Sequence, residues 1–303
     1  MKRINILIFI FGTCAFAQNV ESLLKTDFAI RDFITVNDSV YFIEKRDVHI
    51  LDSKKNKKFK YFIGGYGLEM ELINNNSVLV TASNELVKNI SSVRFFNTKN
   101  NRPENTYFYK KGKILDFVLI PELKLFVLSL TNKKIIVVNY QERPKFHKTI
   151  EINIEAIARK MIYKDNSLYF STDKGEIYKY NFRDYKKTRL YNSKELITDF
   201  LIDKERLIIS TINGKLQSVN LNTFSSSNLT FNDNFINVLV FYNHEKLICG
   251  TWTGKIFIVD LNSFSVKNEF SFHKRSILCI KKIDNQEVYS SSLDKTLKKW
   301  QLH

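Results

Sequence analysis

The feature that most constrains the fold of this chain is a pattern that recurs seven times along it. Each copy has an apolar run, a short polar turn, a second alternating run and a closing polar residue, as in LICGTWTGKIFIVD at residues 247–260. The copies close at Asp52, Asn97, Asn139, Asn181, Asn220, Asp260 and Gln301, which are 39 to 45 residues apart. A period of about 42 residues is typical of four-stranded propeller blades, although helical solenoids have similar periods.

The alternation inside each copy decides between these two classes. Apolar and polar residues alternate every second position, and Ile, Val, Tyr and Phe are frequent, which is typical of strands. Gly175, Gly214 and Gly254 occupy the same place in three copies, and Asn213-Gly214 is a hairpin dipeptide. We therefore interpret these glycines as turn residues, not as a phosphate-binding loop. The prediction is an all-β fold, a seven-bladed β-propeller of four-stranded antiparallel blades.

Further strands are predicted on either side of each hairpin. Inner strands are expected at residues 114–120, 157–163, 197–202, 236–241 and 277–283, and outer strands at segments such as 186–191 and 265–271. The last copy has no outer strand of its own, and residues 20–26 precede the first inner strand without a copy of their own. We expect these two ends to pair, because the pairing would close the ring and cover an open sheet edge.

The first 17 residues have the features of a cleaved secretory signal peptide. A charged start is followed by an apolar run and by Ala15-Phe16-Ala17, a small-x-small cleavage site. The run is shorter than the roughly 20 residues that span a bilayer, and no transmembrane segment is expected elsewhere. We predict one mature domain, residues 18–303, exported to the periplasm or secreted. A lipoprotein acylated at Cys14 is the less favoured alternative, because Phe11-Gly12-Thr13 matches the usual Leu-small-small pattern poorly.

The amino-acid composition excludes some classes of protein and some classes of binding partner. Hydrophobic content of 44% excludes a disordered chain, and three Cys exclude a disulfide-dense scaffold. The formal net charge of +16 comes mostly from lysine runs expected in loops and outer strands. Because export makes nucleic acid an unsuitable partner, we expect none. An anionic envelope surface or an acidic protein patch is the alternative that the charge suggests.

The last copy resembles a WD40 repeat. His273 stands where that family has the His of its Gly-His pair, Asp294 lies in the hairpin turn, Trp300 follows six residues later, and Ser291 or Ser292 lies on the strand between. In that family these residue types form a hydrogen-bonded tetrad, so the resemblance implies a structural tetrad of His273, Ser291, Asp294 and Trp300. The other copies have Leu51, Phe96, Val138, Tyr180, Val219 and Val259 at the Trp position. The period supports a WD40-like propeller over the whole chain, and lactonase-like or quinoprotein-like propellers stay open.

Few residues indicate chemistry. His273, Asp294 and Ser291 have the residue types of an acyl-transfer triad, but the tetrad accounts for them, so no catalytic residue is predicted. The histidines are scattered, and neither a metal nor a cofactor is expected. Cys249 and Cys279 are expected to be buried free thiols in apolar surroundings.

Channel chemistry is likewise not expected. Glu69 and Glu71 share one face of an inner strand and are candidates to line a central channel, with a solvated pair near its mouth as the alternative we favour. We interpret the starts of the inner strands as apolar or mixed, without a repeated Asp, Glu or His.

These patterns together favour a non-enzymatic scaffold, expected to be a monomer, that binds a protein or peptide through loops at one face of the ring. Trp252 is the first candidate contact, with neighbouring loops that carry Tyr66, Lys111, Lys174 and Arg275. The alternative is a propeller enzyme or ligand-binding ring that uses its central channel. Acidic or histidine residues repeated at the inner-strand starts would favour that alternative.

Overall fold

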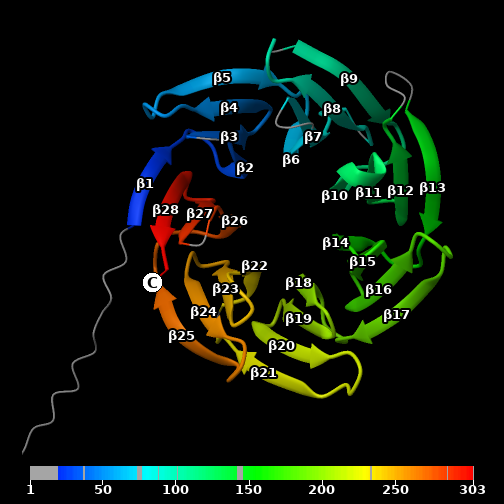
Figure 1. Cartoon of the computed structure of the whole chain (residues 1–303), viewed down its shortest axis with the longest axis vertical. Helices are drawn as coiled ribbons and strands as arrows, with labels where there is room; N and C mark the ends of the chain where they lie inside the picture. The colour runs from blue at the N-terminus through cyan, green and yellow to red at the C-terminus, as the bar shows by residue number, and fades with distance from the viewer. Residues whose placement is uncertain are drawn as a thin grey trace, which may run out of the picture.

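In the computed structural model the strands form seven four-stranded sheets arranged around a central axis (Figure 1). The structure describes residues 20–36, 38–73, 77–87, 89–100, 102–141, 146–232, 234–284 and 286–302. Every paired strand is antiparallel to its neighbour within a blade, and chain order runs from the inner strand outward. The predicted all-β, seven-bladed propeller is confirmed.

The blades follow one another along the chain, each with four strands given from the channel outward. Blade 1 comprises β2 (Ile30–Val36), β3 (Ser39–Glu44), β4 (Asp47–Leu51) and β5 (Lys57–Phe62). Blade 2 comprises β6 (Tyr66–Ile73), β7 (Val78–Asn84), β8 (Ser91–Asn97) and β9 (Arg102–Tyr109). Blade 3 comprises β10 (Ile114–Ile120), β11 (Leu125–Leu130), β12 (Lys134–Asn139) and β13 (His147–Asn153). Blade 4 comprises β14 (Ala158–Lys164), β15 (Ser167–Thr172), β16 (Glu176–Asn181) and β17 (Lys187–Asn192).

The last three blades complete the ring. Blade 5 comprises β18 (Ile197–Asp203), β19 (Arg206–Thr211), β20 (Lys215–Asn220) and β21 (Ser226–Thr230). Blade 6 comprises β22 (Ile236–Phe241), β23 (Lys246–Thr251), β24 (Ile256–Asp260) and β25 (Ser265–Phe270). Blade 7 comprises β26 (Ile277–Lys282), β27 (Glu287–Ser292), β28 (Thr296–Gln301) and, as its outer strand, β1 (Val20–Lys25).

The pairing of β1 with β28 closes the ring. Val20 lies opposite Trp300 and Lys25 opposite Thr296, with one bulge between. The Thr26 N–H continues the ladder by donating to the Lys295 carbonyl at 2.9 Å. The predicted closure by residues 20–26 is therefore confirmed. The predicted signal peptide, residues 1–17, and Cys14 within it lie outside the described residues.

The hydrophobic core lies between adjacent blades and not along the axis. Phe42 of blade 1, for example, shares a cluster with Leu79 of blade 2 and Leu297 of blade 7. The second strands, such as β15, are buried on both sides, third strands such as β16 alternate between buried and partly exposed residues, and outer strands such as β17 and β25 are mostly exposed. The apolar alternation of the sequence thus marks the faces that neighbouring blades bury against each other. No helix in the described ranges is long and apolar enough to cross a membrane.

The chain has only 9 glycines, and three of them lie at the same position of a hairpin turn. Gly175, Gly214 and Gly254 have φ values of 76°, 75° and 90°, as expected for turn glycines. A Cβ at Gly254 would lie 2.5 Å from the His273 carbonyl oxygen, so this turn requires glycine. Elsewhere lysine often takes the left-handed position, as at Lys45, with φ of 53°, and Lys295, with φ of 70°. Lysine and asparagine therefore occupy left-handed backbone positions that glycine would adopt without strain, and each such position costs some conformational free energy.

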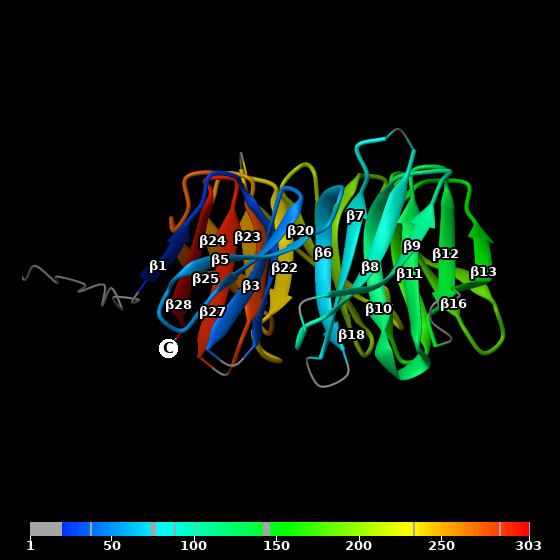
Figure 2. The same cartoon turned by 90° about the horizontal axis from the view of Figure 1, so that it is seen from above.

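Seen from the side, the strands run between two faces that carry the loops (Figure 2). The inner strands all begin at the same face, which we call the entry face. Because the strands of a blade alternate in direction, the turn between its second and third strands also lies at the entry face. The opposite face is called the exit face.

Candidate functional site

The central channel is lined by side chains that a repeated bulge positions. Each of the seven inner strands has a register irregularity within its first four residues. Such a bulge re-aims a side chain relative to a regular ladder. The residue at or just after it lines the central cavity in every blade. These residues, which we call the central ring, are Asp32, Glu69, Asp116, Lys160, Asp199, Val238 and Cys279.

The central ring corrects the sequence interpretation of the inner-strand starts. Three strands begin with the same motif, Ile-x-Asp-Phe, at residues 30–33, 114–117 and 197–200, and Glu69 stands at the same position of β6. The expectation of no repeated acidic residue was wrong, and with it the main reason for preferring a scaffold to a channel site. The motif is visible in the sequence, but the bulge interrupts the strict alternation of apolar and polar residues at the start of each inner strand.

The three aspartates brace adjacent blades. Asp32 Oδ2 accepts a hydrogen bond from the Met70 N–H at 2.8 Å, and Asp199 Oδ2 accepts one from the Leu239 N–H at 2.8 Å. Asp116 Oδ2 accepts the equivalent bond from the Met161 N–H at 2.5 Å. In each case the donor belongs to the inner strand of the next blade. These bonds give each aspartate a structural role, since an unpaired N–H in this position would carry a desolvation cost.

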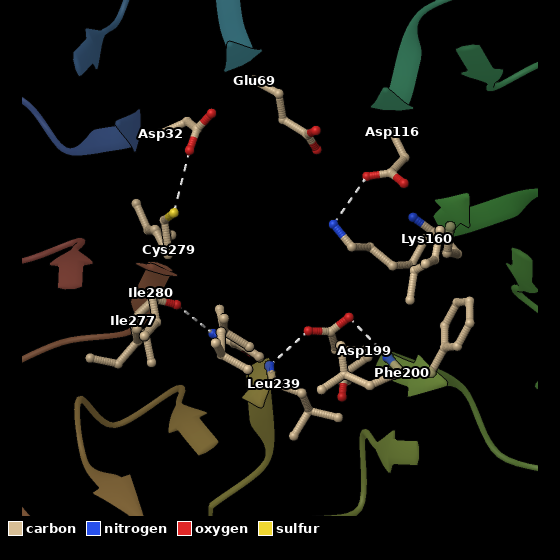
Figure 3. A pocket seen from close by; sticks show the side chains of 18 of the residues that line it. Asp32, Glu69, Asp116, Lys160, Asp199, Phe200, Leu239, Ile277, Cys279 and Ile280 are labelled. Atoms are coloured by element: carbon tan, nitrogen blue, oxygen red, sulfur yellow. Dashed lines mark hydrogen bonds and ion pairs between the residues drawn. The ribbon is translucent and has the colours of Figure 1, made fainter. Parts of the chain in front are cut away.

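Positive groups also reach the central ring. Lys160 Nζ lies 3.4 Å from Asp116 Oδ1 (Figure 3). Lys281 Nζ lies 2.8 Å from Asp32 Oδ1. The negative charge of Asp116 raises the pKa of Lys160 despite its burial. Burial disfavours the charged form of Lys281, but Asp32, Cys279 and Glu71 together outweigh that effect and raise the pKa of Lys281.

Two acidic groups of the channel are shifted towards their neutral forms. Burial raises the pKa of Asp199 to about 6, although Lys160 and two backbone N–H groups act in the opposite direction. Burial also raises the pKa of Glu69 well above its usual value, and the carboxyl of Asp116 adds to that shift. Glu71, two residues further along β6, has a pKa raised by burial as well. Glu69 and Glu71 both line the cavity, the first of the two descriptions that the sequence allowed, with Glu69 partly exposed and Glu71 exposed.

The cavity that these groups enclose has a volume of about 650 Å³. Figure 3 shows Glu69, Asp116 and Asp199 directed into it from three sides. Arg31 and Arg159, each one residue before a central-ring residue, also line it. Its wall between blades 5 and 7 is mainly apolar and includes Leu201, Val238, Val240, Leu278 and Ile280. The three His, Cys, Asp or Glu groups that a metal ion would need are not gathered anywhere in the described ranges.

Both described cysteines are free, as predicted. Cys249 lies in the apolar core of blade 6, and burial raises its pKa. Cys279 was expected in similar surroundings, but it faces the channel, where its Sγ–H donates to Asp32 Oδ1 at 3.3 Å. Burial, followed by the charge of Asp32, raises the pKa of Cys279, so this thiol is held protonated.

The tetrad expected in blade 7 is connected through a different serine. Ser290 Oγ lies 2.8 Å from His273 Nε2 and accepts the Trp300 Nε1–H at 3.1 Å. His273 Nδ1 lies 3.1 Å from Asp294 Oδ2. Among the described residues, the hydroxyl of the predicted Ser291 has no hydrogen-bond partner. The error has a simple cause: Ser290 lies on the face of the sheet that carries Trp300, and Ser291 points to the other face.

The predicted contact residues all belong to the entry face but are spread around it. Tyr66, Lys111, Lys174, Trp252 and Arg275 lie in or next to loops of blades 2, 3, 4, 6 and 7 respectively. Trp252 is 52% exposed and stacks on Phe235, with ring centroids 5.2 Å apart. Tyr66 is 53% exposed. The structure does not bring these five side chains into one cluster.

A denser group of aromatic side chains was missed by the sequence analysis. Phe28, Phe62, Tyr66 and Phe108, which we call the aromatic patch, are about half exposed at the entry side of blades 1 and 2. Three of these rings have a cation over them. Lys45 Nζ lies 3.1 Å from the Phe28 centroid, and the guanidinium carbons of Arg46 and Arg94 lie 4.9 Å and 5.6 Å from Phe62 and Phe108.

Backbone contacts hold the aromatic patch together. The N–H groups of Ile63 and Gly67 donate to the carbonyls of Arg46 and Lys45, each at 2.8 Å. Arg94 donates to the Ile63 carbonyl and forms an ion pair with Glu85 at 2.7 Å. The turn of blade 1 and the start of blade 2 are therefore fixed against each other, which makes the patch a preformed surface.

Comparison with known proteins supports the architecture and nothing finer. No protein-family model matches the chain. No curated protein is similar to it in sequence. Among solved structures, the fold is similar to that of the computationally designed Ika8 protein, with a TM-score of 0.63 and 13% sequence identity. The match covers 93% of this chain and 98% of that one. At this identity the likeness shows the fold alone.

Proposed function

We propose that this propeller is an exported, non-enzymatic scaffold that binds an acidic protein or peptide through its entry face. The observation that carries the proposal is the aromatic patch. Half-exposed aromatic rings with adjacent arginines have the composition of binding hot spots. An exposed apolar group of this kind on a single face is characteristic of an interaction surface.

The charge of the chain supports an acidic partner. Its formal net charge is +16, and the patch is bordered by Lys45, Arg46 and Arg94. A basic rim attracts acidic surfaces over a distance of about a Debye length and raises the association rate. An anionic envelope lipid would be attracted by the same charges, and the test below separates it from a protein.

The polar groups of the channel are already used in hydrogen bonds within the fold, which supports a non-enzymatic role. Asp32, Asp116 and Asp199 each accept a backbone N–H of the next blade. The Cys279 thiol has a raised pKa, which disfavours the nucleophilic thiolate. His273 is 5% exposed and lies in the hydrogen-bond network with Trp300, away from the channel lining.

The same network supports a divergent WD40-like relationship. A His, a Ser, a turn Asp and a Trp are joined by hydrogen bonds in blade 7, as the resemblance implied apart from the serine. Export rests on the sequence features of residues 1–17. Free thiols are compatible with export, because an oxidising compartment permits disulfides but does not require them.

A crosslinking experiment on envelope fractions tests the proposal. The native chain is compared with a Phe62→Ser/Tyr66→Ser double variant and with Tyr185→Ser, a control in the β16–β17 turn at the exit face where the ring is 64% exposed. We expect one protein to be captured by the native chain and the control but not by the double variant, with less capture at high salt. Equal capture by all three, or recovery of lipid alone, would contradict the proposal.

A further inference from the structure

The outer strand of each blade is a sheet edge, because its far side pairs with no other strand among the described residues. An exposed edge presents unpaired N–H and C=O groups and can add a strand from another chain, so proteins commonly protect it with charged side chains, proline or a bulge. Six of the outer strands have such protection. Each of them contains charged residues and a bulge in its pairing with the third strand: β1, β5, β9, β13, β17 and β25.

The outer strand of blade 5, β21, has neither kind of protection within the described residues. Its sequence is SSNLT, and no charged residue occurs from position 216 to position 232. It pairs with β20 in unbroken register, from Thr230 opposite Lys215 to Ser226 opposite Val219. Four of its five residues are exposed. Blade 5 therefore ends in a regular, uncharged and accessible edge.

The free backbone groups of this edge can be identified from the ladder. The Ser225 carbonyl and the Phe231 N–H both bond to the β20 side, at 3.0 Å and 2.8 Å. Residues of an antiparallel ladder alternate between those that bond to the neighbouring strand and those that do not. Ser226, Asn228 and Thr230 therefore direct their N–H and C=O groups away from β20, towards solvent.

These outward groups are complementary to those of a second copy of the chain. Antiparallel pairing about a two-fold axis at Asn228 places Ser226 of one copy opposite Thr230 of the other. All the outward groups are then used, in about six backbone hydrogen bonds. Serine and threonine in opposed positions can add side-chain hydrogen bonds. Because the edge is uncharged, no like charges meet across the axis, although each copy has a formal net charge of +16.

Phe224 provides an apolar group beside the same edge. It lies in the turn just before β21, and it is 66% exposed. In the antiparallel arrangement, Phe224 of each copy lies beside the end of the added strand, near Thr230 of the other copy. Removal of this ring from water would stabilise the pairing.

We propose that the chain forms a two-fold symmetric dimer, in which the β21 strands of two copies pair antiparallel about Asn228 and join two four-stranded sheets into one. This dimer takes the place of the monomer expected from the sequence. Blade 5 lies across the ring from blades 1 and 2, so the aromatic patch of each copy stays uncovered (Figure 1). Antiparallel pairing also turns the two entry faces in opposite directions. The dimer does not depend on which partner binds the entry face.

Sedimentation velocity of the purified chain, from micromolar to millimolar concentration, tests the proposal. We expect a concentration-dependent equilibrium between monomer and dimer. Because the two copies repel each other through their net charge, the dimer should be tighter at high salt, whereas binding of an acidic partner should be weaker. A chain that stays monomeric at every concentration, or a dimer that weakens with salt, would overturn the proposal.

Two charge variants test the pairing itself. Ser226→Glu/Thr230→Glu places carboxylates opposite each other across the axis and should raise the dimer Kd about tenfold or more, although it lowers the net charge that opposes association. Ser226→Lys/Thr230→Glu places opposite charges there and should keep the Kd within about threefold of the native value. Both variants change the same exposed positions, and in both the new carboxylate at position 230 lies opposite Lys215 of its own blade.

The control is Thr188→Glu, an exposed position of β17 that lies opposite Lys179. It adds a carboxylate to a protected edge, so it should dimerise as the native chain does. Equal Kd values for the two charge variants, or loss of the dimer in the control, would overturn the antiparallel pairing of β21.

Discussion

Replacement of Ser290 by alanine should destabilise the propeller far more than replacement of its neighbour Ser291. The Ser290 hydroxyl is the only link between the indole N–H of Trp300 and the Nε2 atom of His273 within the described residues. Trp300 is fully buried and His273 is 5% exposed, so water cannot easily take the place of the hydroxyl. Ser290→Ala therefore leaves one buried donor and one buried ring nitrogen without a partner.

The expected magnitude follows from these two orphaned groups. An unsatisfied buried polar group costs about 1–3 kcal/mol, so the free energy of unfolding should fall by about 2–4 kcal/mol in Ser290→Ala. Ser291 is also fully buried, but its hydroxyl finds no hydrogen-bond partner in the part of the chain that the structure describes. Ser291→Ala should therefore change the free energy of unfolding by no more than about 0.5 kcal/mol.

The two variants are a matched pair. Both remove one hydroxyl from adjacent, fully buried positions of β27, so the loss of volume is the same and the difference reports the hydrogen bonds. Urea unfolding followed by circular dichroism measures the change in the free energy of unfolding for each variant. The comparison holds if the dependence of this free energy on urea concentration is the same for all of them. In a Trp300→Phe background, Ser290→Ala should cost less, because the two residues are coupled. Equal destabilisation by the two alanine variants would refute the argued network.

Three further predictions concern the ring, the channel and the N-terminus. Deletion of residues 20–25 should lower the free energy of unfolding by about 3 kcal/mol or more and broaden the melting curve, because Leu23 and Leu24 pack on the first core cluster; an unchanged curve would contradict this. Burial raises the pKa of Asp199 from 3.8 to about 6, so its contribution to stability is complete below about pH 4 and is lost as pH rises through about 6. Asp199→Asn still accepts the Leu239 N–H but does not titrate. Its free energy of unfolding in urea should therefore vary between pH 4 and 7 by up to about 3 kcal/mol less than that of the native chain. An identical pH profile for the two proteins would count against the raised pKa of Asp199. Intact-mass measurement of the mature protein should give a chain that begins at Gln18, whereas a diacylated Cys14 would show a lipoprotein.

The fold was predictable because the blades repeat one burial pattern. The closing residues and the inner strands could be placed from the burial pattern, since the second strands are buried along most of their length, whereas third strands such as β16 and β28 alternate between buried and partly exposed residues. The ring closure followed from counting strands, and it is confirmed by the pairing of Val20 with Trp300. Where the alternation holds, the expected bounds agree with the structure to within about one residue, as for β14, which begins at Ala158.

The details of the sites depend on features that alternation does not carry. Ser290 and Ser291 differ by one position, and in a strand that difference exchanges the two faces of the sheet. The pairing of Val288 with Trp300 settles the face, because Ser290 is two residues from Val288. Given the hairpin turn at Asp294, this register could have been derived from the sequence.

The aromatic patch could not be predicted from any single copy of the sequence repeat. Phe28 precedes β2, Phe62 ends β5, and Phe108 lies near the end of β9. These positions are far apart in sequence and have different places in their blades. They meet because adjacent blades are fixed against each other at the entry face, so only the assembled ring shows that their rings are exposed together.

Polar side chains of the inner strands brace the blades against one another around the channel. Aspartates in blades 1, 3 and 5 bind blades 2, 4 and 6, and Asn237 of blade 6 donates to the Ile277 carbonyl of blade 7 at 3.3 Å. Blades 2, 4, 6 and 7 have no aspartate at the central-ring position, but two of them still contact a neighbouring blade there: Lys160 Nζ lies 3.4 Å from Asp116 Oδ1 of blade 3, and the Cys279 Sγ–H donates to Asp32 Oδ1 of blade 1 at 3.3 Å. Two of these positions hold the neutral Val238 and Cys279, and the other two hold Glu69 and Lys160. The fold therefore accepts neutral residues at this position, and where a charge stands, as at Lys160, the carboxylate of Asp116 in the neighbouring blade offsets its loss of hydration.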